Sequence, residues 1–398
     1  MNRILYIQNV EEATRELNKI NVSSQGVQVM APKAIGLNIK LENVKLGAAN
    51  ILKQEMLSIG GDAAVARGVV EGKEKISDVI LMGNADKIKK IIKKLEYQTI
   101  FGLSEIKADL EKTLEQILEK SVRILNCNGK EVLLDKIRII GVLNVSPDSF
   151  SDGNEFLNPD KAVEHVLKMI DEGVDIIDIG GESTRPGAEE ISVQTEIQRV
   201  IQIIERLSGK VPISIDTYKA DVAEAAIQAG ASIVNDISAL RFDKSMIKVL
   251  KKNKHIPIIL MHMQGTPRTM QKKPFYQDTI SEILSFLKER IDFCISNGIS
   301  KERILIDPGI GFGKRHSDNL LILKKIMEFH CLNVPIVLGA SRKSFIGRIY
   351  DSTPKERLAG SLAATALAFQ HNIHFVRVHD VKEHKQLLQT LEKVGEAI

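Results

Sequence analysis

Residues 211–236 form the stretch that decides the fold, and they read VPISIDTYKADVAEAAIQAGASIVND. Two short runs rich in β-branched residues, Val211–Asp216 and Ser232–Asp236, lie on either side of a longer segment with helical spacing. Gly230 comes late in that segment, where a left-handed residue lets a helix end before the chain turns into the next strand. A strand, a helix and a second strand in this order predict one βαβ unit.

The same alternation recurs from about residue 137 onward. Asn158 and Pro159, for example, supply a helix cap and a proline at the first helical position. Eight such units in roughly 260 residues predict the α/β class and a (β/α)₈ TIM barrel, with an open doubly wound sheet as the alternative. The expected strands are Arg138–Asn144, Asp175–Gly180, Val211–Asp216, Ser232–Asp236, Pro257–Met261, Arg303–Asp307, Pro335–Gly339 and His374–His379.

The first 125 residues have a different pattern. They contain strand-like runs at residues 4–8 (ILYIQ) and Val79–Met82, and charged helical segments that start at Ala85 and Leu103. The whole chain has 398 residues, and a barrel of this kind needs about 250. We therefore expect a small α/β domain of unknown role at 1–125 and a barrel domain at 126–398.

The charge pattern gives no reason to expect nucleic acid as a partner. The formal net charge is +4 and is not concentrated in a basic arm. The basic run Lys87–Lys94 places Ile88, Ile91 and Ile92 on one face, which favours an ordinary amphipathic helix over a nucleic-acid or membrane helix.

The cysteines and the apolar runs predict a soluble, cytoplasmic protein. Cys127, Cys294 and Cys331 are odd in number and lack metal-binding spacing, so we expect reduced thiols and no zinc. The apolar run at the N-terminus is too short for a signal peptide, and no stretch of about 18 apolar residues predicts a membrane span.

Polar residues end almost every expected strand. Each could be a helix cap or a satisfied rim residue, but so many together favour a site, because TIM-barrel active sites lie at the carboxyl ends of the strands. These residues are Asn144, Asp178, Asp216, Thr217, Asn235, Asp236, His262, Asp307, Ser341 to Ser344, Arg377 and His379.

The phrases that surround these strand ends resemble dihydropteroate synthase over the whole barrel, in family order and one per strand. One departure is Ser146, where the family more often has threonine, and the first 125 residues lie outside the resemblance. The phrases are GVLNVSPDSFSDG (141–153), GGESTRPG (180–187), SIDTYKADVAEAA (214–226), VNDI (234–237), LMHMQGTPRTMQ (260–271), IDPGIGFGK (306–314), GASRKSFIG (339–347) and RVHDV (377–381).

The resemblance implies a transferase of folate biosynthesis that joins 4-aminobenzoate to 6-hydroxymethyl-7,8-dihydropterin diphosphate. A reduced pterin donates from N3–H and its amino group and accepts at O4 and N5, so carboxylates, an amide and a cation complement it. Carried over by position, Asp307 accepts from the N3 and amino edge, Asn235 contacts the amino group, Asp216 supports the other ring, and Lys343 reaches O4 and N5. Met261, Gly311 and Gly339 complete the expected substrate contacts.

The leaving diphosphate needs charge neutralisation. Mg²⁺ suits this task because it borrows ligands from phosphate, so the single oxygen of Asn144 is expected to hold it. Arg377 and His379 are expected to form the anion pocket. An arylamine is neutral at pH 7 and attacks a cationic methylene without a dedicated base. The residues that the resemblance implies as catalytic are Asp148, Arg185, Lys343, Arg377 and His379.

The resemblance also implies mobile loops and a second substrate site. Asp148 and Asp152 of the first loop, with Thr184 and Arg185 of the second, are expected to order both substrates. Pro186, Phe312 and Ser344 are the expected aminobenzoate contacts, and sulfonamides, as mimics, should compete there. Barrels of the family commonly form homodimers.

Two other functions stay open from the sequence. A methyltransferase that moves a methyl group from methyltetrahydrofolate to a corrinoid shares the barrel, but it has no use for the anion-binding phrases. A non-catalytic pterin-binding paralogue would keep the fold without turnover. Gly309, Gly311 and Gly313 are not a dinucleotide loop, because they follow Asp-Pro and lack the downstream acid of that motif.

Overall fold

The computed structural model describes residues 3–5, 7, 9–118, 123–145, 158–183 and 189–396. The chain forms two compact units, Met1–Ser121 and Val122–Ile398. The expected boundary after residue 125 falls inside β4 (Arg123–Cys127), which pairs with β5 (Lys130–Leu134) and belongs to the second unit. Nothing in the local composition marks this hairpin as part of the barrel, because its place is set by the apolar residues it covers.

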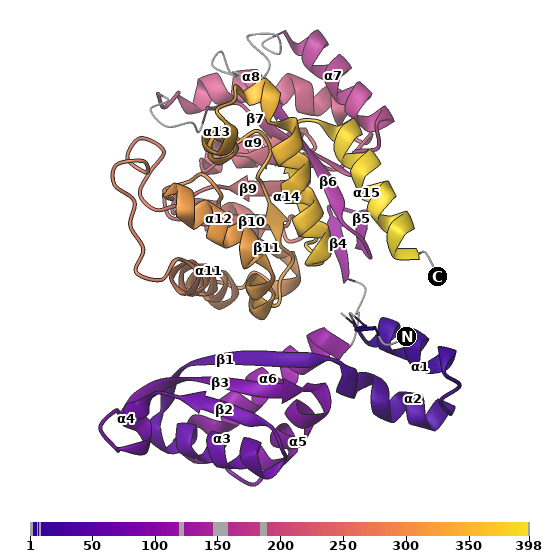
Figure 1. Cartoon of the computed structure of the whole chain (residues 1–398). Coiled ribbons are helices and arrows are strands. Elements are labelled where there is room, and N and C mark those ends of the chain that lie inside the picture. Colours follow the sequence, from indigo (N-terminus) through magenta and orange to yellow (C-terminus); the bar gives the residue numbers. More distant parts are fainter. Residues whose placement is uncertain are drawn as a thin grey trace. The chain divides into compact units, whose positions relative to one another are not determined.

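The N-terminal unit contains a three-stranded antiparallel sheet in the order β1-β3-β2 (Figure 1). The apolar faces of its helices bury one side of the sheet in a separate core. The elements are α1 (Val10–Lys19), α2 (Ser24–Met30), η1 (Ala31–Ala34), β1 (Gly36–Lys45), α3 (Leu46–Ser58), β2 (Asp62–Val65), α4 (Arg67–Val70), β3 (Ile76–Asn84), α5 (Ala85–Leu95), η2 (Ile100–Gly102) and α6 (Leu103–Leu118).

Several expectations for this unit can be compared with the structure. The predicted strand and both predicted helix starts agree with β3, α5 and α6. Ile88, Ile91 and Ile92 are buried in α5, so its lysines form the solvated face of an amphipathic helix. The strand expected at residues 4–8 is not formed by its described residues, and Ile4 is 99% exposed.

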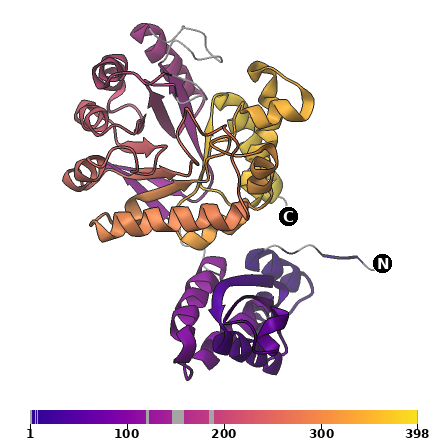
Figure 2. The ribbon, with the colours of Figure 1, turned by 90° about the vertical axis from the view of Figure 1, so that its left-hand side faces the viewer.

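The second unit is a barrel of eight parallel strands with helices outside (Figures 1 and 2). The strand order is β11-β10-β9-β8-β7-β6-β13-β12, and a bridge between Ile306 and Ile336 joins the two ends. The strands are β6 (Arg138–Asn144), β7 (Ile176–Gly180), β8 (Ile213–Asp216), β9 (Ile233–Asp236), β10 (Ile258–Met261), β11 (Ile304–Asp307), β12 (Val337–Leu338) and β13 (Phe375–Val378).

Each strand of the barrel leads into a helix, and β12 into two, and the caps predicted at Asn158 and Gly230 are present. Asn158 accepts from the backbone of Asp160 ahead of Pro159, and Gly230 ends its helix at φ +118°. The helices are α7 (Pro159–Asp171), α8 (Val193–Leu207), α9 (Ala220–Ala229), α10 (Met246–Lys252), α11 (Thr279–Ser296), α12 (His316–Lys324), α13 (Ser344–Tyr350), α14 (Leu358–Gln370) and α15 (Val381–Glu396), with short turns η4 (Lys301–Arg303), η5 (Ile326–Leu332) and η6 (Pro354–Arg357).

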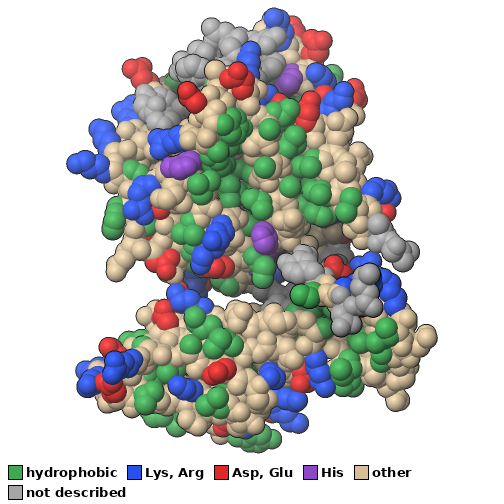
Figure 3. All heavy atoms as spheres, in the orientation of Figure 1, with side chains coloured by type: hydrophobic (Ala, Val, Ile, Leu, Met, Phe, Trp, Pro, Cys, Tyr) green, Lys and Arg blue, Asp and Glu red, His purple; other side chains and the backbone are tan. Residues whose placement is uncertain are grey.

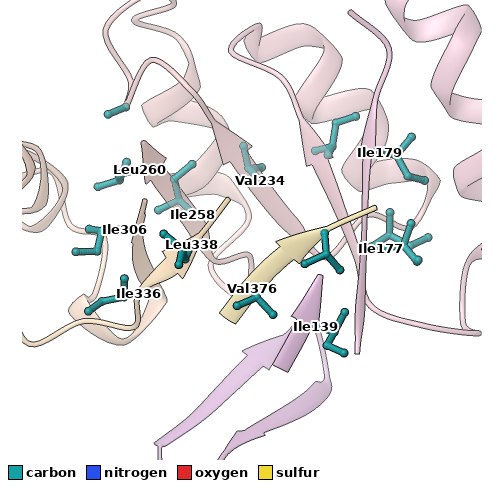
Figure 4. Close-up of a cluster of buried hydrophobic side chains, with 14 of the residues drawn as sticks. Ile139, Ile177, Ile179, Val234, Ile258, Leu260, Ile306, Ile336, Leu338 and Val376 are labelled. Atoms are coloured by element: carbon teal, nitrogen blue, oxygen red, sulfur yellow. The ribbon is translucent and has the colours of Figure 1, made fainter. Parts of the chain in front are cut away.

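Alternate strand residues build two apolar layers. One set, which includes Ile139, Ile177 and Leu260, packs with the helices around the barrel (Figure 4). The other set points into the barrel, where the β4–β5 hairpin adds Leu125 and Cys127 to it. Because side chains alternate with a period of two, the inward positions continue to the carboxyl ends of the strands, where all of them except Met261 are polar or small. They are Asn144, Asp178, Gly180, Asp216, Asn235, Met261, Asp307, Gly339, Arg377 and His379.

The surface charges and the composition of the helices are as the sequence predicts. Lys and Arg side chains are interspersed with Asp and Glu on the visible face of each unit (Figure 3). Among the helices of the described residues, none is both long enough and apolar enough to cross a membrane.

Candidate active site

Arg377 links two buried carboxylates at the centre of the carboxyl end of the barrel. Its Nε donates to Asp178 Oδ2 over 2.6 Å, and one terminal nitrogen donates to Asp216 Oδ2 over 2.9 Å. Asn235 Nδ2 donates to the same Asp178 oxygen over 3.1 Å. Asp178 is fully buried, whereas the Arg377 side chain is 20% exposed. These bonds hold residues of four strands, β7, β8, β9 and β13, in one rigid group.

This group keeps unused acceptors. Asp178 Oδ1 and Asp216 Oδ1 are buried and have no hydrogen-bond partner among the described residues. Burial, reinforced by the charge of Asp178, raises the pKa of Asp216 to about 7, although Arg377 opposes the shift. A buried acceptor without a partner is costly, so these oxygens are suited to receive N–H groups from a ligand.

Asp307 and Lys343 form the opposite side of the site. Asp307 Oδ1 accepts from the Gly309 backbone over 2.7 Å, and Lys343 Nζ donates to the Ile310 carbonyl over 2.6 Å. A Cβ on Gly339 would lie 3.4 Å from Asp307 Oδ2 and 3.5 Å from Lys343 Nζ. Glycine at position 339 therefore leaves room between the carboxylate and the amine for a flat ligand.

Burial shifts both of these groups toward neutrality. It raises the pKa of Asp307, which the nearby Lys343 partly opposes. It lowers the pKa of Lys343 to about 8, and Asp307 partly opposes that shift. The Lys343 ammonium also lies 4.8 Å from the centroid of the Phe312 ring. An amine with this pKa donates as a cation at neutral pH and can lose its proton near pH 8.

The loop that carries Gly311 and Phe312 is held in place by contacts with His262 and Lys314. Gly309 has φ +71°, and a Cβ there would lie 1.9 Å from the His262 carbonyl oxygen, so only glycine fits. Lys314 Nζ lies 2.9 Å from His262 Nδ1 and donates to the Phe312 carbonyl over 3.1 Å. Burial lowers the pKa of Lys314 well below its usual value. The strand-end residue His262 thus supports this loop through Lys314 and through the close approach of its carbonyl to Gly309.

An apolar wall lies beside this loop. Met261, expected as a substrate contact, packs with Ile237, Met263 and Met270, and Phe312 and Tyr218 pack against the cluster. Flexible methionine side chains adapt to the face of a planar ring. Beyond Met261 and Phe312 the wall was not predicted from the sequence, because its members come from the ends of four strands, β8 to β11.

The residues expected to meet the diphosphate lie toward β6 and β13. Asn144 borders the pterin side, since a Cβ on Gly180 would lie 3.7 Å from Asn144 Oδ1 and 3.8 Å from Asp216 Oδ2. His379 Nδ1 lies 3.1 Å from Ser341 Oγ. Ser344 is exposed at the start of α13. Two nitrogens of Arg377 donate to carboxylates, which leaves one terminal nitrogen for the expected anion pocket.

Four predicted site residues, Asp148, Thr184, Arg185 and Pro186, lie outside the described residues, as does Asp152. Within the described part of the chain, no group of three or more His, Cys, Asp or Glu side chains could hold a metal ion. Asn144 Oδ1 with the neighbouring Asp216 offers only oxygen atoms, which is the donor type that Mg²⁺ prefers.

Comparison with known proteins shows to which family the chain belongs. The sequence model of the family described as pterin binding enzyme matches residues 140–379. Dihydropteroate synthase of Escherichia coli strain K12 is 44% identical over 270 residues, which cover 67% of this chain and 95% of the relative. The chain belongs to the dihydropteroate synthase family.

Solved structures of dihydropteroate synthases have the same barrel. The Yersinia pestis enzyme in a sulfonamide drug complex has a TM-score of 0.67 and 39% identity, and the match covers 69% of this chain and all of that one. The described core is therefore that of a dihydropteroate synthase transferase, and the corrinoid methyltransferase alternative is not supported. The (β/α)₈ prediction is confirmed.

The N-terminal unit lies outside the family match but has relatives of its own. A probable bifunctional folylpolyglutamate synthase/dihydropteroate synthase of Halobacterium salinarum is 36% identical over 387 residues, covering 97% of this chain and 46% of that protein. The similarity to this dihydropteroate synthase relative thus extends through both units.

Asp178 was expected only as a polar strand end, without a role in the site. The alternation of side chains along β7 could have indicated this role, because Asp178 and Gly180 are two residues apart and therefore both point into the barrel. The structure places Asp178 as the carboxylate that receives both Arg377 and Asn235.

Proposed function

We propose that the barrel unit condenses 4-aminobenzoate with 6-hydroxymethyl-7,8-dihydropterin diphosphate to give 7,8-dihydropteroate and diphosphate. The observation that carries this proposal is the set of buried acceptors at the barrel centre, Asp178 Oδ1 and Asp216 Oδ1, opposite Asp307 and Lys343. A reduced pterin has N–H donors on both rings and acceptors at O4 and N5, and this pattern is complementary to that set.

Each of these side chains receives a role in the proposal. Asp307 Oδ2 accepts from N3–H and the 2-amino group, while Lys343 donates toward O4 and N5. Asp216 accepts from the other ring, and Asn235 contacts the amino group beside Asp178. Buried bonds of this kind also exclude ligands without matching donors, because the acceptors would then stay unpaired.

The reaction exchanges one bond for another. The bond from the methylene carbon to the diphosphate oxygen breaks and its electron pair leaves with the diphosphate. The arylamine nitrogen then forms the new C–N bond and loses one proton. Developing positive charge on the pterin is stabilised by the nearby carboxylates of Asp307 and the Asp178–Asp216 group.

Mg²⁺ fits the oxygen donors at Asn144 and would neutralise charge on the diphosphate when bound. His379, placed by Ser341, would face the same anion with the remaining nitrogen of Arg377. Asp148, Thr184, Arg185 and Pro186, outside the described residues, keep the loop and aminobenzoate roles that the resemblance implies. Phe312 and Ser344 would contact the aminobenzoate.

Cytoplasmic location and a homodimer of the barrel remain predictions. The first rests on the three cysteines, none of which forms a disulfide with another among the described residues. The second rests on the family resemblance alone.

The experiment that tests the function measures diphosphate release by the full chain, with and without 4-aminobenzoate and with and without Mg²⁺. Release that requires both additions is the expected result. If the pterin diphosphate binds and no diphosphate is released, the chain is a non-catalytic pterin-binding paralogue. Release without 4-aminobenzoate would instead indicate hydrolysis. The matched control is Asp318→Asn, because Asp318 is buried against Arg315 outside the proposed site.

A further inference from the structure

We propose that β1 of the N-terminal unit pairs with β1 of a second copy of this chain, which makes one continuous six-stranded sheet. The N-terminal sheet has the order β1-β3-β2, so β1 is an edge strand. β1 has ten residues, whereas the opposite edge strand β2 has four. No strand pairs with the outer side of β1 in the described part of the chain.

The backbone groups on this edge follow from the register with β3. Ala85 donates to the Ile35 carbonyl and Leu46 donates to the Lys75 carbonyl, so these are hydrogen-bonded pairs at the two ends of β1. Hydrogen-bonded and non-bonded pairs alternate in an antiparallel ladder. Counting from Ile35, the N–H and C=O groups of Gly36, Asn38 and Lys40 therefore point away from β3, toward the open edge.

The apolar side chains on the helix-covered face are also incompletely buried at this edge. Val79 and Leu81 of the central strand β3 are fully buried. Leu37, Ile39 and Leu41 of β1 share that face and pack on the same core, but each stays partly exposed. A strand added beside β1 would cover these three apolar side chains, and this burial favours association.

A second β1 satisfies both requirements at once. Antiparallel pairing places outward-pointing residues opposite one another. With Ile39 at the twofold axis, Asn38 of one copy faces Lys40 of the other, and Leu37 faces Leu41. Centring the pair on Lys40 instead would put two like charges opposite each other, which is unfavourable.

The limits of the pairing are also visible in the sequence. The register between β1 and β3 shifts between Leu41 and Val44, and Asn43 has φ +56°. This bulge ends the regular part of the edge after Leu41. The paired segment centred on Ile39 is thus Leu37–Leu41, and its twofold symmetry closes the pair, so that it does not extend into a fibre.

One test is cross-linking in the full chain. The exposed Cys331 is replaced by serine, and Cys127 and Cys294 are buried. In this background, Ile39→Cys should form an oxidised dimer of twice the 44.2 kDa chain, because the two residues face each other across the axis. The matched control is Leu37→Cys on the same face, whose own copy lies about 14 Å away along the strands at 3.4 Å per residue, beyond disulfide reach.

A second test is the particle mass of the full chain in solution. Lys40→Pro removes an outward N–H and leaves the ladder to β3 intact, and proline is tolerated on edge strands. We expect half the mass of the wild type at equal concentration where β1 is the only contact between the two copies. Where the barrels of the same two copies also pair, the mass stays the same, and adding Lys40→Pro to the Ile39→Cys variant should abolish the cross-link. Lys40→Ala keeps the N–H and should keep the mass. Asn38→Pro is the substitute if Lys40→Pro does not give the far-ultraviolet circular dichroism of the wild type.

Three results would overturn the proposal. One is an equal yield of cross-linked dimer from Ile39→Cys and Leu37→Cys, and another is no cross-link from either variant. The third is a mass and an Ile39→Cys cross-link yield that both proline variants leave unchanged, which would mean that the outward N–H groups of β1 are not used in the assembly.

Discussion

Replacing Asp178 by asparagine should shift the pH dependence of pterin binding to lower pH. In the wild type the pKa of Asp216 is about 7, raised first by burial and next by the charge of Asp178. Asparagine keeps the shape of the side chain and removes that charge. The pKa of Asp216 should therefore fall by about 1 unit or more.

The size of the effect follows from linkage. If bound pterin donates to ionised Asp216, binding weakens as pH falls through the pKa of the free site. With that pKa at about 7, wild-type affinity at pH 6 should be about tenfold weaker than at pH 8. With the pKa at 6 or below, the same change in the variant should be about twofold or less. At pH 8 the variant should bind about 5- to 150-fold more weakly, because one buried acceptor is mispaired by about 1–3 kcal/mol.

The assay is calorimetric titration of a pterin without diphosphate from pH 5.5 to 9. Lys343, with a pKa of about 8, affects both proteins at the alkaline end and so cancels in the comparison. The control is Ser214→Ala, which removes a buried hydroxyl two residues earlier in β8 and should leave the midpoint unchanged. A midpoint that stays near 7 or rises in Asp178→Asn would refute the coupling between the two carboxylates.

Four other outcomes are expected. Asp307→Asn should weaken pterin binding by about 1–3 kcal/mol in calorimetry, and wild-type affinity would remove Asp307 from the pterin edge. Arg377→Ala should weaken both bare pterin and diphosphate binding, because Arg377 holds Asp178 and Asp216; a loss confined to diphosphate would support a purely anion-binding role. Sulfonamides should compete with 4-aminobenzoate and not with the pterin in steady-state kinetics, and competition with the pterin would contradict separate subsites. The unfolding free energy in denaturant titrations should fall as pH drops below about 6.5, because burial lowers the pKa of His374 to about 3 and the folded state then binds fewer protons than the unfolded chain; a flat profile from pH 7 to 5 would contradict this.

The sequence by itself determined the eight strands, their capped helices and the family. These features depend on local rules, since β-branched runs, helix caps and left-handed glycines need only their neighbours along the chain. The inward position of Asp216, Asn235, Asp307 and Arg377 was also predictable, because they end strands whose side chains alternate with a period of two.

Only the tertiary structure decided which of those strand ends meet. Arg377 is 199 residues from Asp178 and 161 residues from Asp216, and barrel closure brings the three into contact. The same closure turns His262 toward Lys314 and away from a role in the site. It also assigns the β4–β5 hairpin to the barrel, because that hairpin covers apolar residues from strands far along the chain. Alternation along one strand fixes the face of a side chain, whereas its partners depend on which strands become neighbours.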